Sequence, residues 1–177
     1  MSLSGPPSAE EVVAALVGTS PRRRKGRTPA EGLTQTARAR TRAVSRLDLR
    51  GVTVLVVEDH PDSRELLREI VESFGATVVV AGDGEDALRK VAWVRPGLVL
   101  CDLRMPLLDG FGFIDRLRRD PALSRTPVIA VTALGTETDV MRTWQAGFNG
   151  HLVKPIDYGT IAAQLARVFW AHWRRQG

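Results

Sequence analysis

Apolar residues follow two alternating patterns along this chain. Short continuous apolar runs bounded by turn residues are typical of strands that are buried on both faces of a sheet. Such runs predict strands at residues 52–57, 77–81, 98–101, 127–131 and 150–153. Between them, apolar positions recur at helical spacing and predict helices over residues 61–74, 85–94, 111–117, 136–146 and 158–173.

Regular alternation of strands and helices predicts an α/β fold, in which helices cover both faces of a parallel sheet. The pattern extends over residues 51–173, which we take as one folded domain. Residues 1–50 lack the pattern and are interrupted by several Pro and Gly residues. We predict that they form a flexible or partly helical basic N-terminal segment or linker.

Charge separates the same two regions. Residues 1–50 contain ten Lys or Arg and four Asp or Glu, a net charge of +6, whereas residues 51–177 contain fifteen and sixteen, a net charge of −1. The overall charge of +5 therefore belongs to the N-terminal segment. We interpret its basic cluster at residues 22–25 as a solvated run of the chain. Binding of nucleic acid by this segment is the less favoured alternative.

The sequence shows no apolar run near the roughly 18 residues of a membrane span. It also lacks a cationic start followed by an apolar stretch, which a signal peptide would have. Cys101 is the only cysteine, so no internal disulfide forms. We expect a cytoplasmic protein.

Polar side chains stand directly after four of the predicted strands. Glu58 and Asp59 follow the first strand, Asp102 the third, Thr132 the fourth and Lys154 the fifth. The carboxyl ends of parallel strands meet at one edge of the sheet, where α/β proteins place their reactive groups. Three carboxylates at one place repel one another unless a cation joins them, and an all-oxygen set suits Mg²⁺. The neighbouring hydroxyl and lysine suit a transferred phosphoryl group, for which Asp102 is the candidate acceptor.

Four segments of the chain carry a resemblance to a known family: VLVVEDHPDSRELL, LVLCDLRMPLLDGF, PVIAVTAL and GHLVKPID. Together they resemble the receiver domain of bacterial two-component response regulators, over about residues 51–172. The resemblance implies a flavodoxin-like (βα)5 three-layer sandwich with sheet order 2-1-3-4-5. It also implies a phosphorelay, in which a sensor histidine kinase or a histidine phosphotransfer protein donates the phosphoryl group.

The resemblance further implies a role for each residue at the strand ends. Asp102 would accept the phosphoryl group, and Thr132 and Lys154 would bind its oxygens. The ligands of Mg²⁺ (or Mn²⁺) would be Glu58, Asp59, Asp102 and the backbone carbonyl of Arg104. Such a domain is a signalling phosphoacceptor and not an enzyme acting on a separate substrate.

Phosphorylation would also operate a switch in this family. Thr132 would shift together with the residue at position 151, which changes the face formed by the fourth helix, fifth strand and fifth helix. Many receivers carry Tyr or Phe there, so His151 is a departure. We expect its ring to pack inward as a steric plug, with a response to pH as the alternative. Glu58 in place of Asp is a mild variation, and Arg104 places a long side chain beside the phosphorylation site.

Trp144, Trp170 and Trp173 lie on the last two predicted helices. Helical spacing points Phe169 and its apolar neighbours toward the sheet and leaves Trp170 and Trp173 nearer the outside. Exposed aromatic residues mark interfaces, so a homodimer through this face is one interpretation. Packing of these side chains within the chain is the other.

Several other α/β proteins are excluded by missing motifs. A dinucleotide-binding oxidoreductase needs a glycine-rich first turn, but residues 58–62 read EDHPD and would repel a pyrophosphate. The P-loop and the serine hydrolase elbow are absent as well. Two alternatives stay open, namely the C-terminal receiver of a hybrid histidine kinase and a phosphotransferase or phosphatase that acts through Asp102.

Overall fold

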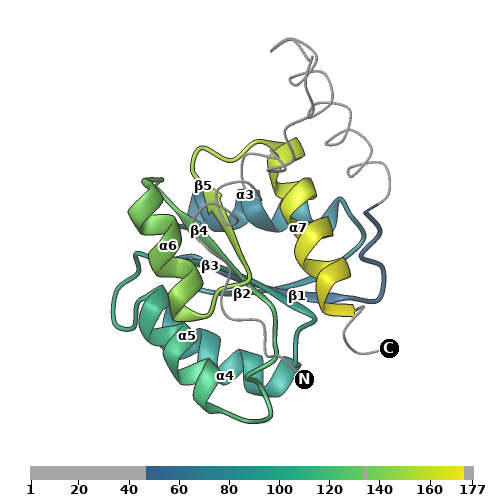
Figure 1. Cartoon of the computed structure of the whole chain (residues 1–177). Coiled ribbons are helices and arrows are strands. Elements are labelled where there is room, and N and C mark those ends of the chain that lie inside the picture. Colours follow the sequence, from purple (N-terminus) through teal and green to yellow (C-terminus); the bar gives the residue numbers. More distant parts are fainter. Residues whose placement is uncertain (1–46, 134, 174–177) are drawn as a thin grey trace, which may run out of the picture.

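The computed structural model describes residues 47–133 and 135–173. Five strands form one parallel sheet in these ranges, in the order β2-β1-β3-β4-β5 (Figure 1). The strands are β1 (Thr53–Val57), β2 (Thr77–Ala81), β3 (Leu98–Asp102), β4 (Val128–Thr132) and β5 (Gly150–Val153). The helices that follow them are α3 (Pro61–Glu72), α4 (Gly84–Val94), α5 (Gly110–Arg119), α6 (Glu137–Ala146) and α7 (Tyr158–Trp173).

This architecture confirms the predicted α/β fold and its strand order. Each predicted strand and helix is present, and no end differs by more than two residues from its predicted position. Pro61 begins α3, as its missing N–H allows at the first helical position. Asp83 caps α4 by accepting from the Asp86 N–H, and Gly147 ends α6 in the left-handed conformation that favours glycine.

Two apolar cores lie on opposite faces of the sheet. Helices α3 and α7 cover one face, and α4, α5 and α6 lie on the other (Figure 1). Alternate residues of β1 enter the two cores, because successive side chains of a strand point to opposite faces. Val54 and Val56 pack with the α3/α7 core, and Leu55 and Val57 pack with the α4/α5 core. The sheet is therefore buried on both faces, which explains its continuous apolar runs.

The packed part of the chain begins before Gly51. Leu47 and Leu49 are buried in the α3/α7 core. The Leu49 N–H donates to the Phe74 carbonyl at 2.8 Å, which joins the approach to β1 to the end of α3. The rest of the predicted basic segment, with its cluster at 22–25, lies outside the described residues.

Among residues 47–133 and 135–173, no helix combines the length and the apolar character that a bilayer span requires.

Candidate functional site

The carboxyl edge of the sheet brings together the polar residues that the sequence places at the strand ends. Asp102 is the last residue of β3 and Thr132 the last residue of β4. The parallel register sets Asp102 beside Val131 and Thr132 beside Val153. Asp102 is only 6% exposed and Thr132 is fully buried. A polar edge is thus built into the end of an otherwise apolar sheet.

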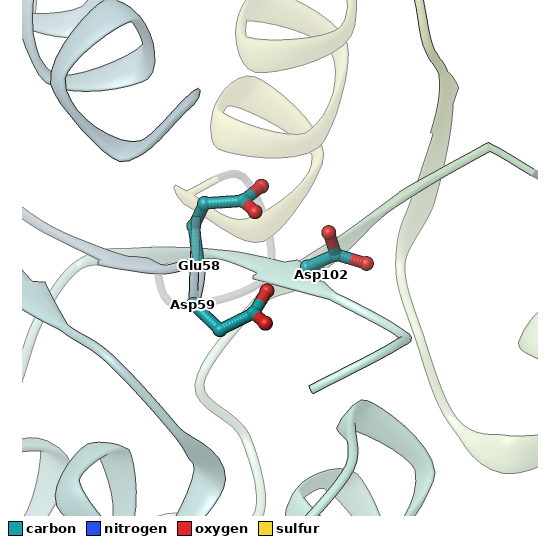
Figure 2. A group of neighbouring side chains, drawn as sticks. All are labelled: Glu58, Asp59 and Asp102. Carbon is teal, nitrogen blue, oxygen red and sulfur yellow. The ribbon is translucent and has the colours of Figure 1, made fainter. Parts of the chain in front are cut away.

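Three carboxylates converge at this edge. Glu58, Asp59 and Asp102 each offer an oxygen, and these oxygens lie within 4.8 Å of one another. Figure 2 shows Glu58 and Asp59 leaving the end of β1 and extending toward the side on which Asp102 leaves β3. Glu58 is 1% exposed, whereas Asp59 is exposed. One face of the cluster is consequently closed by protein and the other is open to solvent.

Lys154 joins two of these carboxylates. Its Nζ donates to Glu58 Oε2 at 2.7 Å and to Asp102 Oδ2 at 2.6 Å. Its backbone N–H donates to the Thr132 carbonyl at 2.8 Å, which fixes the start of the loop after β5. All five residues predicted at the strand ends therefore lie at one edge, and three of them are joined by direct ion pairs.

Burial and neighbouring charges change the proton affinity of two groups. Burial raises the pKa of Glu58, and the charge of Asp102 adds to this, while the hydrogen bond from Lys154 opposes it. Burial alone would lower the pKa of Lys154, but its hydrogen bonds to Asp102 and Glu58 raise that pKa overall. The Lys154 ammonium therefore stays charged, and Glu58 takes up a proton more readily than an ordinary glutamate.

Backbone groups hold the Asp102 side chain in place. The Arg104 N–H donates to Asp102 Oδ1 at 2.9 Å, so each carboxylate oxygen has one donor. Gly110 begins α5 directly behind the strand end. A Cβ at Gly110 would lie 2.4 Å from the Asp102 carbonyl oxygen, a distance that no side chain tolerates. Glycine is needed here because helix and strand backbones approach closely.

The oxygen set fits a hard divalent cation. Two buried carboxylates and one exposed carboxylate offer only oxygen ligands, which suits Mg²⁺ or Mn²⁺ better than a thiol- or imidazole-binding metal. The family resemblance adds the backbone carbonyl of Arg104 to this set. Arg104 is held near the cluster by the hydrogen bond from its N–H to the Asp102 carboxylate. The donor chemistry thus agrees with the predicted cation.

His151 lies inside the domain, on β5. It is 3% exposed, and its Nδ1 is 3.1 Å from Thr143 Oγ1 on α6. The Thr143 hydroxyl donates its single proton to the Val140 carbonyl at 2.7 Å, so it accepts from the imidazole. This geometry places a proton on Nδ1 of His151 and links β5 to α6. The inward packing of the ring agrees with the prediction.

The tryptophans divide into two groups. Trp170 and Trp173 are 45% and 52% exposed on α7, and Phe169 is buried beneath them, as predicted. Trp144 on α6 is only partly exposed, and the Arg167 guanidinium lies 5.5 Å from its ring centroid. Trp144 therefore belongs mainly to the packing between α6 and α7.

Sequence reasoning missed three features of the molecule. Thr143, the partner of His151, carried no signal of its own. Trp93 on α4 is 88% exposed, and its position opposite the buried Ala87 and Val91 on the helix would have indicated this. Leu107, in the loop after β3, is 86% exposed with a φ of 64°, a conformation that leucine rarely adopts.

A parallel sheet of order 2-1-3-4-5 with a carboxylate cluster and a lysine at its carboxyl edge defines a flavodoxin-like α/β domain with an ion- or phosphate-handling site. The family model described as "Response regulator receiver domain" matches residues 54–166. The match extends over more than half of the chain, and the chain belongs to this family. Receiver domains are signalling domains that interact with histidine kinases or phosphotransfer proteins and bind Mg²⁺ at an acidic site.

Curated relatives share the domain but differ in length. The chain is 42% identical over 104 residues to an uncharacterized 14.6 kDa protein of Leptolyngbya boryana, covering 59% of this chain and 79% of that protein. It is 35% identical over 115 residues to the probable transcriptional regulator ycf27 of Guillardia theta, covering 65% of this chain and 44% of that protein. It is 41% identical over 101 residues to a gliding motility regulatory protein of Myxococcus xanthus, covering 57% of this chain and 13% of that protein. The chain thus spans less than half of the two longer relatives.

Solved structures show the same fold. The receiver domain of a signal transduction histidine kinase from Syntrophus aciditrophicus is 31% identical with a TM-score of 0.63, covering 68% of this chain and 91% of that one. The receiver domain of the sensor histidine kinase PA1611 from Pseudomonas aeruginosa is also 31% identical with a TM-score of 0.63, covering 67% and 98%. In that structure a magnesium ion is coordinated in the active site cleft.

Proposed function

We propose that this chain is a phosphoacceptor in a two-component phosphorelay, and that Asp102 receives the phosphoryl group from a phosphohistidine of a kinase or phosphotransfer protein. The observation that carries the proposal is the environment of the Asp102 carboxylate. It lies at the edge of the sheet between the Lys154 ammonium and the Arg104 N–H, with two further carboxylates nearby. Membership of the receiver family supports the same assignment.

The chemistry requires a nucleophile and neutralisation of charge. One Asp102 oxygen would form a P–O bond while the P–N bond to the donor imidazole breaks, and the imidazole leaves with the electron pair. Lys154, already in contact with Asp102, would neutralise charge on the transferred oxygens, and the Thr132 hydroxyl would donate to them. Glu58, Asp59, Asp102 and the Arg104 carbonyl would hold Mg²⁺, which when bound neutralises phosphoryl charge.

Intact mass measurement tests this proposal. The protein is incubated with Mg²⁺ and acetyl phosphate beside Asp102→Asn and the control Asp115→Asn, whose carboxylate is exposed on α5 and pairs with Arg119. We expect one added phosphoryl mass on the wild type and on the control, and none on Asp102→Asn. An adduct on Asp102→Asn, or no adduct on the wild type even with an active cognate kinase, would contradict the proposal.

Our proposal extends to a switch through Thr132 and His151. Thr132 ends β4, and His151 reaches α6 through Thr143, so a shift at the phosphorylation site has a packed route to the α6-β5-α7 face. Trp144 follows Thr143 directly and provides a fluorescence reporter. We expect His151→Ala to reduce the fluorescence change that phosphorylation produces while leaving the mass adduct intact. An undiminished change would contradict the coupling.

Partner binding by that face is part of the same proposal. Exposed Trp170 and Trp173 favour an interface, either between two copies of this chain or with another protein. Trp173→Ala should weaken self-association after phosphorylation in sedimentation velocity, with the exposed Trp93→Ala as the matched control. The similarity to receiver domains of two histidine kinases keeps a hybrid kinase as the second candidate setting for this domain.

A further inference from the structure

A cavity of about 440 Å³ opens at the amino edge of the sheet, the end opposite the carboxylate cluster. It lies where β4 and β5 begin and where α6 and α7 pass close to the end of α5. Arginine is its main polar component, and no Asp or Glu lines it. Its lining includes Arg118, Arg125, Pro127, Trp144, Arg167 and Val168.

The arginines of this cavity differ from those on the rest of the surface. Arg68, Arg116 and Arg119 each pair with a carboxylate on the outside of the domain. Arg118 and Arg167 have no carboxylate partner among the described residues. Arg118 donates instead to carbonyl and amide oxygens, those of Ser124, Thr126, Gly147 and Asn149. Positive charge is thus collected at one place without a counter-charge from the part of the chain that the structure describes.

These two cations lose part of their hydration. Partial burial lowers the pKa of both Arg118 and Arg167, since a charged guanidinium is less stable away from solvent. Arg118 is half-buried, whereas the Arg167 side chain stays exposed to solvent at the mouth of the cavity. An anion in the cavity would therefore be stabilised by charges that the fold has already brought together.

Donors are still available to such an anion. Arg118 uses all five of its N–H groups within the domain, but Arg125 makes no hydrogen bond or ion pair within the described ranges. Arg167 engages Nε and Nη2 with Gln164 and Asn149, which leaves its Nη1 group unused. The indole N–H of Trp144 is covered by protein and has no acceptor among the described residues, so only the ring of this residue contributes to the cavity wall. Within the described ranges, the donors available to an anion are therefore the Arg125 guanidinium and the Nη1 group of Arg167.

The size and the lining of the cavity indicate the chemical class of the anion. Pockets for small organic ligands measure roughly 300–1,000 Å³, so this cavity has more room than one inorganic phosphate fills. Pro127, Val168 and the indole of Trp144 supply an apolar and aromatic part of the wall. We propose that the cavity binds a nucleoside monophosphate, with its phosphate between Arg125 and Arg167 and its base against this apolar wall. The site is separate from Asp102 and does not depend on the proposed phosphorylation.

Indole NMR signals test the proposal directly. The chain has four tryptophans, so a ¹H–¹⁵N spectrum shows four indole signals, of which Trp144→Phe identifies one. We expect titration with adenosine or guanosine monophosphate to shift the Trp144 signal in a saturable manner. The signal of the exposed Trp93 on α4 should stay in place and serve as the internal reference.

Variants distinguish the site from general attraction of anions. Arg125→Gln should weaken binding about tenfold, and the fold should be retained because this exposed side chain makes no hydrogen bond or ion pair with the described residues. The control Arg89→Gln removes another exposed arginine, on α4, and should leave binding unchanged. No saturable shift at millimolar nucleotide, equal affinity for inorganic phosphate, or equal weakening by both variants would each overturn the proposal.

Discussion

The two ends of the sheet bury charge in opposite ways. At the carboxyl edge, the Glu58 and Asp102 carboxylates are both joined to the Lys154 ammonium, and each contact is an ion pair. At the amino edge, Arg118 is held by neutral oxygens alone. The first arrangement depends on charge balance, which one added cation or phosphoryl group changes. The second depends on the fixed backbone geometry around Arg118, which suits a structural framework more than a switch.

The comparison is tested most strongly by removing the cation at the carboxyl edge. Lys154→Met leaves two buried carboxylates facing each other, and we expect it to lower the free energy of unfolding by about 3 kcal/mol at neutral pH without Mg²⁺. Urea denaturation provides the measurement. The control Lys90→Met breaks a half-buried pair with Asp86 and a hydrogen bond to the Val80 carbonyl, and should cost only about 1 kcal/mol. Equal costs for the two variants would show that the carboxyl edge is not held by charge balance.

A second variant addresses the amino edge. Arg118→Met removes the donors that satisfy the carbonyls of Gly147, Ser124 and Thr126, and we expect a loss of about 2 kcal/mol. Because no ion pair is broken, the loss should be nearly the same at low and high salt. Its neighbour Arg119→Met breaks only an exposed pair and should cost under about 1 kcal/mol. A loss for Arg118→Met that disappears in salt would contradict the framework interpretation.

The smallest expected effect is a change in pH dependence. The pKa of Glu58 is raised above its ordinary 4.5, so its contribution to stability is complete below pH 4.5 and is lost as pH rises through the raised value. Glu58→Gln should therefore gain stability relative to the wild type as pH rises from 4.5 toward neutrality, as measured by urea midpoints. The exposed Glu69→Gln serves as the control and should follow the wild type.

Lys154 determines how stability changes at the alkaline end of the pH range. Its pKa is raised above 10.5, so the stability that it contributes is complete below pH 10.5 and is lost as pH rises through the raised value. The difference in the free energy of unfolding between the wild type and Lys154→Met should consequently become smaller in strongly alkaline buffer. A constant difference across this range would contradict the assigned ion pairs.

Much of the fold could be predicted because each segment of residues 51–173 shows either the apolar run of a buried strand or the apolar spacing of a helix, and seldom both. The central strands β1, β3 and β4 are buried on both faces, so they appear as apolar runs such as 98–101. The carboxylate cluster could be predicted as well, since parallel strands necessarily end at the same edge. Asp102 and Glu58 needed no knowledge of side-chain packing to be placed together.

The remaining contacts depend on how the helices rotate and dock. Arg116, Arg118 and Arg119 are a basic run on one helix, and only the packed structure shows that Arg118 turns toward the α6–β5 turn while the others pair on the surface. The contact between His151 and Thr143 likewise requires the position of α6 over β5. No spacing in the sequence encodes these rotations, so they are found only in three dimensions.

The attachment of Leu49 to the end of α3 has a consequence for how this domain is joined to anything that precedes it. The Leu49 N–H is fixed to the Phe74 carbonyl, and β1 then runs about 17 Å, five residues at roughly 3.3 Å each, before it delivers Glu58 to the opposite edge. A polypeptide segment that precedes Leu47 therefore enters the domain at the edge of the sheet opposite Asp102. The point of attachment and the proposed phosphorylation site thus lie about the length of one strand apart.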